Sequence, residues 1–312
     1  MVKEVIRIGT RGSKLALWQA NYVAELIRKR YPFVKVELVI VKTKGDKILD
    51  VPLAKIGGKG LFVKEIEDKI LSKEIDLAVH SMKDVPVELP KGLKVGIVPK
   101  SEDPCDCFVS ERFSSIYDLP KGSVIGTSSL RRRVQIKHLR EDLKIEPLRG
   151  NLDTRIKKLK DGKFDAIIVA FAGIKRLGIC PKFLEKFDPK VFIPAVGQGA
   201  LGIEYREEDK ELESFLSFLD DPKTKYRVLA ERSFLKKLQG GCQVPMGCYA
   251  HLKDSTLEII GFLSSTDGKT KIISKKQGPF DQYKSLGEEL AEDILKRGGE
   301  KILKEIYQSE GI

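Results

Sequence analysis

The chain has 312 residues, of which 41% are hydrophobic and 33% charged, a balance typical of a globular protein with two or three domains. No apolar run is long enough to span a bilayer. The start, residues 1–7, mixes charges with a strand-like pattern and lacks the features of a signal peptide, so we expect a cytoplasmic protein without a membrane partner. The formal net charge of +12 favours an anionic partner, but charge alone does not choose among nucleic acid, a membrane surface and an acidic small molecule.

Short apolar strands alternate with amphipathic helices in the first hundred residues. Apolar residues recur at helical spacing in two segments, 13–30 and 61–71. Strands are predicted at 5–9, 34–41 and 76–79, and residues 43–59 are rich in turn-forming residues. Because Pro86 disfavours helical geometry at Val85, Asp84 is expected on a turn.

The same alternation restarts near residue 124, and a different pattern follows residue 221. Strands are predicted at 124–126, 144–148 and 165–170, with helices at 130–139 and 152–160. This alternation is typical of parallel sheets covered by helices. The last part predicts a small α+β unit with a helix at 224–238, strands at 244–253, 256–263 and 270–274, and a terminal helix from about residue 283.

Two short sequences occur in both halves of the α/β region. Ile8-Gly9-Thr10 matches Ile125-Gly126-Thr127, and residues 76–79 match residues 165–168. Chance similarity between strands is one explanation, and two related halves are the other. Related halves would face each other across a cleft with their strand C-termini pointing inward, and we expect the chain to cross between them at 99–106 and 192–199.

Basic and hydroxyl residues follow the predicted strands at 10–13, 127–133 and 149–155. Three arginines, 131–133, lie in the first turn of a predicted helix, where the helix dipole disfavours cations. An anion held at that end would explain them, because free N–H groups, hydroxyls and guanidiniums all bind carboxylate or phosphate. A solvated basic helix face is the alternative, and the repetition at several strand ends favours the anion site.

Asp84 lies beside Lys83 after a predicted strand. An aspartate at a turn is often a turn-former or an ion-pair partner. A carboxylate at the C-terminal end of a strand is also able to share protons with a substrate or to stabilise a developing cation. The spacing leaves both interpretations open.

The five cysteines lack the spacing of a metal site or a disulfide scaffold, so we expect no metal and mostly buried or incidental thiols. Cys242 differs because it follows Gly240 and Gly241, and a glycine-rich turn lets a thiol project as a nucleophile or attachment point. The residues by themselves favour an inert buried thiol even there.

Seven segments taken together resemble the porphobilinogen deaminase (hydroxymethylbilane synthase) family. They occur in the family's order across residues 8–247, as IGTRGSKLALWQ, GGKGLFVKEIE, DLAVHSMKDVP, IGTSSLRRRVQ, LRGNLDTRIKKL, PAVGQGALGIE and ERSFLKKLQGGCQVPMG. The resemblance implies an α/β fold with two periplasmic-binding-protein-like domains with mainly parallel sheets, plus a small α+β C-terminal domain. The implied domains are 1–99 with 200–217, 105–193, and 222–312, in a monomer.

The resemblance also implies roles for individual residues. Cys242 would hold a dipyrromethane cofactor through a thioether, and Asp84 would be the catalytic aspartate. The cofactor's acid groups would be bound by Lys83, Ser81, Thr127, Ser129, Arg131, Arg132, Arg155 and Gly150. The substrate and the growing chain would be bound by Arg11, Ser13, Arg149, Arg155 and Arg176, with Lys55 and Lys59 on or beside a mobile loop and Gln198 at a hinge.

The implied reaction joins four porphobilinogen molecules head to tail on the cofactor and releases ammonia and the linear tetrapyrrole hydroxymethylbilane. Each substrate carries an acetate and a propionate, so the growing chain accumulates carboxylates for the strand-end arginines to bind. Loss of ammonia from the aminomethyl group gives a cationic azafulvene, which Asp84 would stabilise through the pyrrole N–H.

Two other functions agree with parts of the sequence. A non-catalytic anion-binding protein or sensor of periplasmic-binding-protein shape would explain the cleft and the arginines, but it leaves Cys242 and Asp84 unexplained. A nucleic-acid binder would use the net charge and residues 131–133. Aromatic residues make up only 7% of the chain and are not interleaved with the basic clusters, so we expect no nucleic-acid partner.

Overall fold

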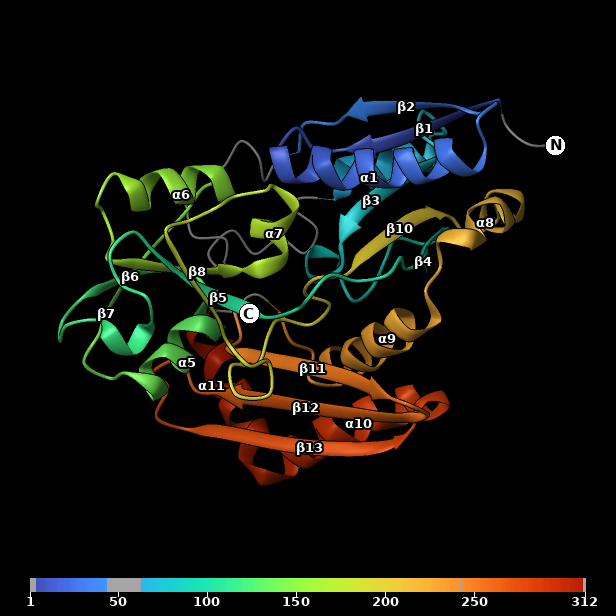
Figure 1. The fold of residues 1–312 in the computed structure, drawn as a ribbon. Helices are drawn as coiled ribbons and strands as arrows, with labels where there is room; N and C mark the ends of the chain where they lie inside the picture. The colour runs from blue at the N-terminus through green and yellow to red at the C-terminus, as the bar shows by residue number, and fades with distance from the viewer. Residues whose placement is uncertain (1–3, 44–62, 242, 311–312) are drawn as a thin grey trace. The chain divides into compact units, whose positions relative to one another are not determined.

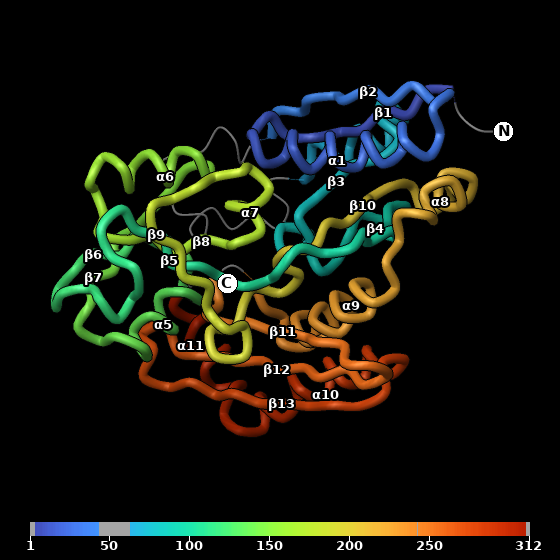
Figure 2. The backbone as a smooth tube through the Cα atoms, in the orientation of Figure 1, coloured from blue at the N-terminus to red at the C-terminus, as the bar shows by residue number. Residues whose placement is uncertain are grey.

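The computed structural model describes residues 4–43, 63–241 and 243–310, and the chain forms two compact units (Figure 1). Of the described residues, unit 1 holds 4–43, 63–102 and 199–225, and unit 2 holds 103–198 and 226–310. Along these residues the chain passes from one unit to the other at 102–103, 198–199 and 225–226. Figure 2 traces the backbone from the N-terminus to the C-terminus. The finer division into three domains stays a prediction.

Unit 1 is built on a five-stranded sheet with the order β2-β1-β3-β10-β4. Its strands are β1 (Val5–Thr10), β2 (Lys35–Ile40), β3 (Leu77–Ser81), β4 (Leu93–Ile97) and β10 (Leu201–Arg206). β1 pairs in parallel with β2 and β3, whereas β10 runs antiparallel to both β3 and β4. Four strands therefore share one direction, as predicted for a mainly parallel sheet.

Helices cover both faces of this sheet. α1 (Lys14–Arg30) packs along β1 and β3 (Figure 1), and its buried Val23 and Ile27 join Leu77 and Val79 in one apolar core. α4 (Lys64–Leu71) packs with Ala78, which points to the opposite face because side chains alternate along a strand. α8 (Lys210–Leu216) follows β10.

The sheet of unit 2 repeats this plan with the order β7-β6-β8-β5-β9. β6 pairs in parallel with β7 and β8, and β5 runs antiparallel to β8 and β9. The elements are β5 (Asp106–Ser110), β6 (Val124–Gly126), α5 (Leu130–Leu139), β7 (Lys144–Glu146), α6 (Leu152–Lys160), β8 (Ala166–Ala170), α7 (Phe171–Arg176) and β9 (Phe183–Lys186). The matching sequences at 8–10 and 125–127 end equivalent strands, which supports two related halves.

The C-terminal part of unit 2 is an antiparallel sheet with the order β11-β12-β13. Its strands are β11 (Met246–Lys253), β12 (Thr256–Ser264) and β13 (Lys271–Pro279), and its helices are α10 (Tyr283–Ile294), α11 (Glu300–Glu310) and α9 (Pro222–Lys237), whose first four residues belong to unit 1. Phe234 of α9 and Leu290 of α10 pack against Cys248 and Leu263 on one face. Alternate residues such as Phe262 contact Val134 of α5. The predicted small α+β part is confirmed.

Among the described elements, three strands (β4, β5 and β9) and two helices (α7 and α8) were not predicted from the sequence. The predicted crossing segments 99–106 and 192–199 do contain the passages at 102–103 and 198–199. The clearest miss is β5, because Asp106, the last residue of the first crossing segment, begins a strand that lies inside the sheet. All five residues of β5 are buried, so the strand shows no alternation of polar and apolar residues. The expected terminal helix is interrupted at Leu295–Gly299, where Gly298 has a φ of +106°.

Candidate functional site

A small pocket lies at the C-terminal ends of β1 and β3 in unit 1. It is lined by Arg11, Ala16, Gln19, Val63, Ile66, Val79, His80, Ser81 and Asp84. Three residues predicted for the site, Arg11, Ser81 and Asp84, therefore come together. Gln19 and His80 line the same pocket and were not predicted.

The turn between β1 and α1 places Arg11 at the pocket. Thr10 is buried, and its hydroxyl donates to the carbonyl of Ala16 at 3.1 Å, which fixes the turn against the helix. Ser13 is the N-cap of α1, and its hydroxyl oxygen accepts a hydrogen bond from the backbone N–H of Ala16 at 3.3 Å. The structure thus gives Ser13 a capping role, and its contact with substrate stays a prediction.

Asp84 lies on a short 3₁₀ turn, Met82–Asp84, as the following proline predicted. Met82 is buried, and its backbone N–H donates to the carbonyl of Ala200 at 3.0 Å, which anchors the turn to β10. Lys83 and Asp84 are exposed on this anchored turn. The carboxylate of Asp84 is therefore presented at the pocket by a fixed backbone.

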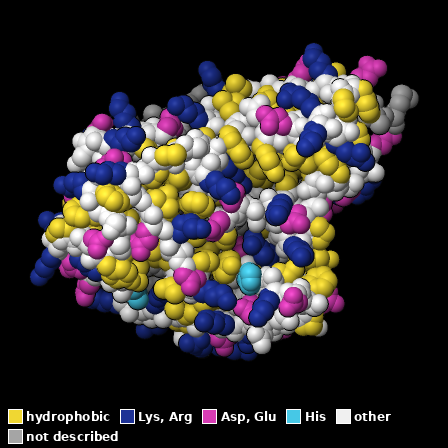
Figure 3. Space-filling model, viewed as in Figure 1, with side chains coloured by type: hydrophobic (Ala, Val, Ile, Leu, Met, Phe, Trp, Pro, Cys, Tyr) yellow, Lys and Arg dark blue, Asp and Glu magenta, His cyan; other side chains and the backbone are white. Residues whose placement is uncertain are grey.

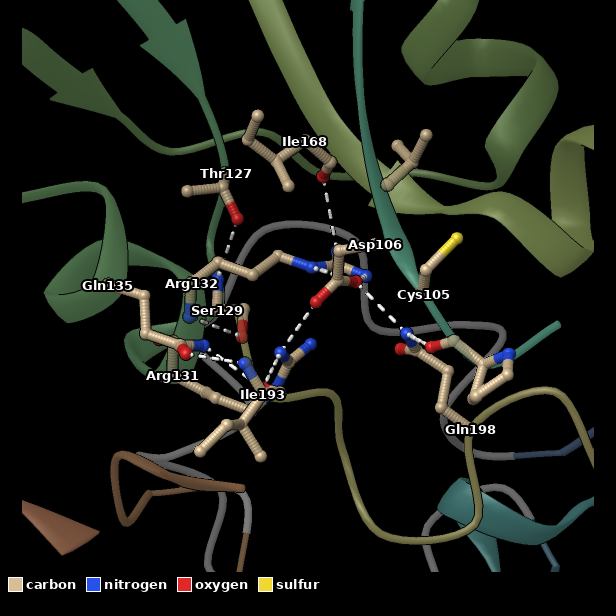
Figure 4. A network of polar contacts seen from close by, with 12 residues as sticks. Cys105, Asp106, Thr127, Ser129, Arg131, Arg132, Gln135, Ile168, Ile193 and Gln198 are labelled. Atoms are coloured by element: carbon tan, nitrogen blue, oxygen red, sulfur yellow. Dashed lines mark hydrogen bonds and ion pairs between the residues drawn. The ribbon is translucent and has the colours of Figure 1, made fainter. Parts of the chain in front are cut away.

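In unit 2, Arg131 and Arg132 converge on the carboxylate of Asp106 (Figure 4). Nη1 of Arg131 donates to Oδ2 of Asp106 at 2.6 Å, and Nη2 of Arg132 donates to Oδ1 at 2.7 Å. Burial disfavours ionisation of Asp106, but the two guanidiniums outweigh it and hold the pKa of that carboxyl well below its ordinary value. Asp106 is therefore ionised, and it was not predicted as part of the site.

This network holds two positive charges for one negative charge. Arg131 and Arg132 are each 6% exposed, so the excess charge lies close to the interior. Nη1 of Arg131 also donates to the carbonyl of Ile193 at 2.8 Å. Within the part of the chain that the structure describes, Nε and Nη2 of Arg131 donate to no protein acceptor. An excess charge with unused donors suits a carboxylate ligand.

The N-terminus of α5 lies in the same place as this network. Ser129 caps the helix, with its hydroxyl oxygen accepting from the backbone N–H of Arg132 at 3.4 Å. Thr127 is buried, and its hydroxyl oxygen accepts from the N–H of Ser129 at 3.2 Å. The first turn of α5 contains no acidic residue. The predicted hydroxyls and arginines thus gather at one helix end, where an anion is favoured.

Gln198 connects this network to the segment that precedes β10. Its Nε2 donates to the carbonyl of Pro104 at 2.6 Å and to Oδ1 of Asp106 at 3.1 Å (Figure 4). Glu231 of α9 joins the same segment to β11, because its carboxylate accepts from the N–H of Gly197 at 2.7 Å and from the N–H of Ala250 in β11 at 2.9 Å. Burial raises the pKa of Glu231 to about 7. Contact of Gln198 with substrate remains a prediction.

Gly150 and Arg155 are joined at the start of α6. Gly150 has a φ of +105°, and a Cβ there would lie 2.8 Å from Cγ2 of Thr154, so the position requires glycine. Its carbonyl accepts from Nε of Arg155 at 2.9 Å, and the carbonyl of Arg149 accepts from Lys158 at 3.1 Å. These bonds fix the loop that carries both predicted arginines. Arg176, the last predicted arginine, ends α7 and is half-buried.

Cys242, Lys55 and Lys59 lie outside the described residues. Of the described cysteines, Cys105, Cys107 and Cys248 are buried and Cys180 is exposed. Burial raises the pKa of Cys107 to about 12, which keeps its thiol unreactive at neutral pH. Among the described residues, no group of His, Cys, Asp and Glu is arranged to hold a metal ion.

Charged side chains are mixed on the face drawn in Figure 3. Lys and Arg are interspersed there with Asp and Glu and do not gather into a continuous basic stripe. That face gives no support to a nucleic-acid surface. No helix in the described part of the chain is both long and apolar enough to cross a membrane.

Two sheets of the same plan, each with ligand-binding residue types at strand ends, define an α/β protein of the periplasmic-binding-protein type. Two family models match the chain: "Porphobilinogen deaminase, dipyromethane cofactor binding domain" over residues 6–214 and "Porphobilinogen deaminase, C-terminal domain" over residues 225–296. The chain therefore belongs to the porphobilinogen deaminase family.

Relatives named porphobilinogen deaminase match nearly the whole chain. The protein of Maridesulfovibrio salexigens is 55% identical over 302 residues, which cover 97% of this chain and 98% of the relative. The protein of Syntrophobacter fumaroxidans is 52% identical over 309 residues, covering 99% of this chain and 100% of the relative. Among solved structures, the periplasmic aliphatic sulphonate binding protein of Escherichia coli is 18% identical, with a TM-score of 0.41 over 76% of this chain and 71% of that one.

Proposed function

We propose that this chain condenses four porphobilinogen molecules into hydroxymethylbilane on a dipyrromethane attached to Cys242. The observation that carries the proposal is the pocket of unit 1, where Asp84 and Arg11 lie together. The carboxylate of Asp84 matches the positive charge that develops on the pyrrole during the reaction. The guanidinium of Arg11 matches a carboxylate side chain of the substrate. Family membership supports this choice of substrate.

The residues of unit 2 suit the acid groups of a dipyrromethane. When bound, this cofactor supplies the nucleophilic pyrrole α-carbon on which the product chain grows. Arg131 carries unused donors and shares the network's excess positive charge, so it is the first residue to which we assign a carboxylate. The other residues proposed to bind the cofactor are Arg132, Thr127, Ser129, Arg155, Gly150, Ser81 and Lys83.

Asp84 is the proposed catalytic residue. Its exposed carboxylate would accept a hydrogen bond from the substrate pyrrole N–H and stabilise the positive charge that develops as the carbon–nitrogen bond to ammonia breaks. Arg11 would hold a substrate carboxylate in the same pocket. The remaining proposed contacts with substrate and growing chain are Ser13, Arg149, Arg155, Arg176, Lys55, Lys59 and Gln198. The proposal includes a monomer that acts in the cytoplasm.

The test is turnover of porphobilinogen by the purified protein. We expect four ammonia molecules to be released for each linear tetrapyrrole, with both products followed in the same reaction by ammonium assay and mass spectrometry. Saturable binding of porphobilinogen without release of ammonia would contradict the enzyme assignment. That result would favour the anion-binding protein or sensor.

A further inference from the structure

Three buried ionisable side chains lie at or next to the pocket of unit 1, on the face of the sheet that α4 covers. They are Glu67 of α4, His80 of β3 and Glu204 of β10, which are 5%, 7% and 1% exposed. Nε2 of His80 lies 2.8 Å from Oε2 of Glu204. Glu204 is paired with Ala78 across the antiparallel strands, so it points to the same face as His80, the face that α4 covers. We call these three residues the buried triad.

The triad contains more acceptors than the described residues satisfy. Oε1 of Glu67 and Oε1 of Glu204 are both buried and have no hydrogen-bond partner among the described residues. Burying an ionised carboxylate without a full set of hydrogen-bond partners is costly. One further proton on a carboxylate removes this cost.

Electrostatics identify Glu67 as the group that takes this proton. Burial and then the charge of Glu204 raise the pKa of Glu67 to about 7, and His80 opposes the shift. The neighbouring charges on α4 act in opposite directions, because Asp68 raises this pKa and Lys64 lowers it. Glu67 therefore exchanges its proton near neutral pH, where an enzyme of this kind would work.

The triad is in direct contact with the pocket. His80 lines the pocket together with Asp84 and Arg11, and Ile66, the residue before Glu67, lines it as well. A charge that appears in the pocket therefore acts on the triad through a short, mostly buried path, where electrostatic effects are stronger than in water.

We propose that Glu67, His80 and Glu204 are positioning residues that form a proton store for the site, taking up a proton when an anion occupies the pocket and releasing it when positive charge develops beside Asp84. The proton is exchanged with solvent, and no covalent bond to substrate is involved. The proposal rests on the proposed function only for the identity of the charges that enter the pocket. The store itself is testable without turnover.

The first test compares the thermal unfolding of the wild type and Glu67→Gln between pH 5 and pH 8. Because the pKa of Glu67 is raised in the folded state, its stabilising contribution is complete below its unfolded value near 4.5 and is lost as pH rises through about 7. The glutamine side chain of the variant is uncharged at every pH, so the variant does not lose this stability as pH rises. We compare the unfolding midpoint of the variant with that of the wild type at each pH. The difference, variant minus wild type, should be roughly 5 °C larger at pH 8 than at pH 5.

The second test is the pH dependence of kcat/KM for porphobilinogen. We expect the wild-type profile to have an inflection near pH 7, and Glu67→Gln to remove this inflection or to move it by more than about half a pH unit. A purely structural loss would instead lower the rate equally at all pH values. In case this variant does not fold, His80→Gln gives an independent result. Loss of a group that lowers the pKa of Glu67 should move both the inflection and the stability change to higher pH.

The matched control is Glu25→Gln, which changes an exposed carboxylate on α1. Its unfolding curve and pH profile should parallel those of the wild type. The proposal is overturned if Glu67→Gln behaves as the control does in the unfolding series. If the unfolding series succeeds and no porphobilinogen is consumed by the wild type, the proposed function fails and the proton store stands.

Discussion

Asp84→Asn should lower the turnover of porphobilinogen by about two to three orders of magnitude while the protein stays folded. Asp84 is exposed, and among the described residues its carboxylate forms no hydrogen bond or ion pair on which the fold depends. Asparagine keeps the shape of the side chain and removes its charge. The loss should therefore fall on the reaction, which needs a negative charge next to the developing cation.

The measurement for Asp84 is the initial rate of ammonia release at saturating porphobilinogen, with a thermal unfolding curve on the same sample. Glu88→Gln is the matched control, because Glu88 is another exposed carboxylate on the segment that follows Asp84. The control should retain the wild-type rate. More than a tenth of the wild-type rate in Asp84→Asn, with the fold intact, would refute the catalytic role.

Asp106→Asn should destabilise the protein by about 3–5 kcal/mol, because it leaves two buried guanidiniums without their counter-charge. The amide of asparagine has one acceptor oxygen in place of two, so Arg131, Arg132 and Gln198 compete for it. The common anchor of the arginines and of the segment before β10 is therefore weakened. We therefore expect the variant to bind the cofactor poorly as well.

The pH dependence of this loss has a definite sign. The pKa of Asp106 is held below its ordinary value, so its stabilising contribution is present above about pH 4 and is lost as pH falls further. The gap between wild type and Asp106→Asn, measured by urea unfolding, should narrow from pH 7 to pH 3. Equal stability of the two proteins at pH 7 would contradict the account of the network.

Asp142→Asn is the control for the buried pair. Asp142 also bonds an arginine, Arg140, at 2.8 Å, but the two side chains are 28% and 18% exposed. Solvent screens such a pair, and its loss should cost about 1 kcal/mol or less. The comparison separates the effect of burial from the effect of removing any aspartate.

The elements that the sequence predicts well have a local signal. β6, α5 and α6 have the predicted bounds because hydrophobic periodicity and capping residues act within a few positions. β5 was missed because all five of its residues are buried, and β9 was missed because it has only four residues, so neither shows an alternating pattern. Their pairing depends on partners far away in the chain, which no local window contains.

The candidate site divides in the same way. Strand-end arginines and hydroxyls are visible in the sequence because their residue types stand out after apolar strands. Asp106 was not predicted because it lies 25 residues before Arg131 and meets it only when β5 enters the sheet. The buried triad was hidden for the same reason, since Glu204 is 124 residues from His80. Acidic residues inside apolar stretches, at 106 and 204, were the available signal.

The proposed reaction depends on a dipyrromethane bound to Cys242, on which the product chain is built. The most direct measurement is the intact mass of the denatured protein, for the wild type and for Cys242→Ala. We expect a wild-type mass above the sequence value by two linked pyrrole units, and the bare sequence mass for the variant. A wild type that has the bare mass both before and after incubation with porphobilinogen would contradict this expectation.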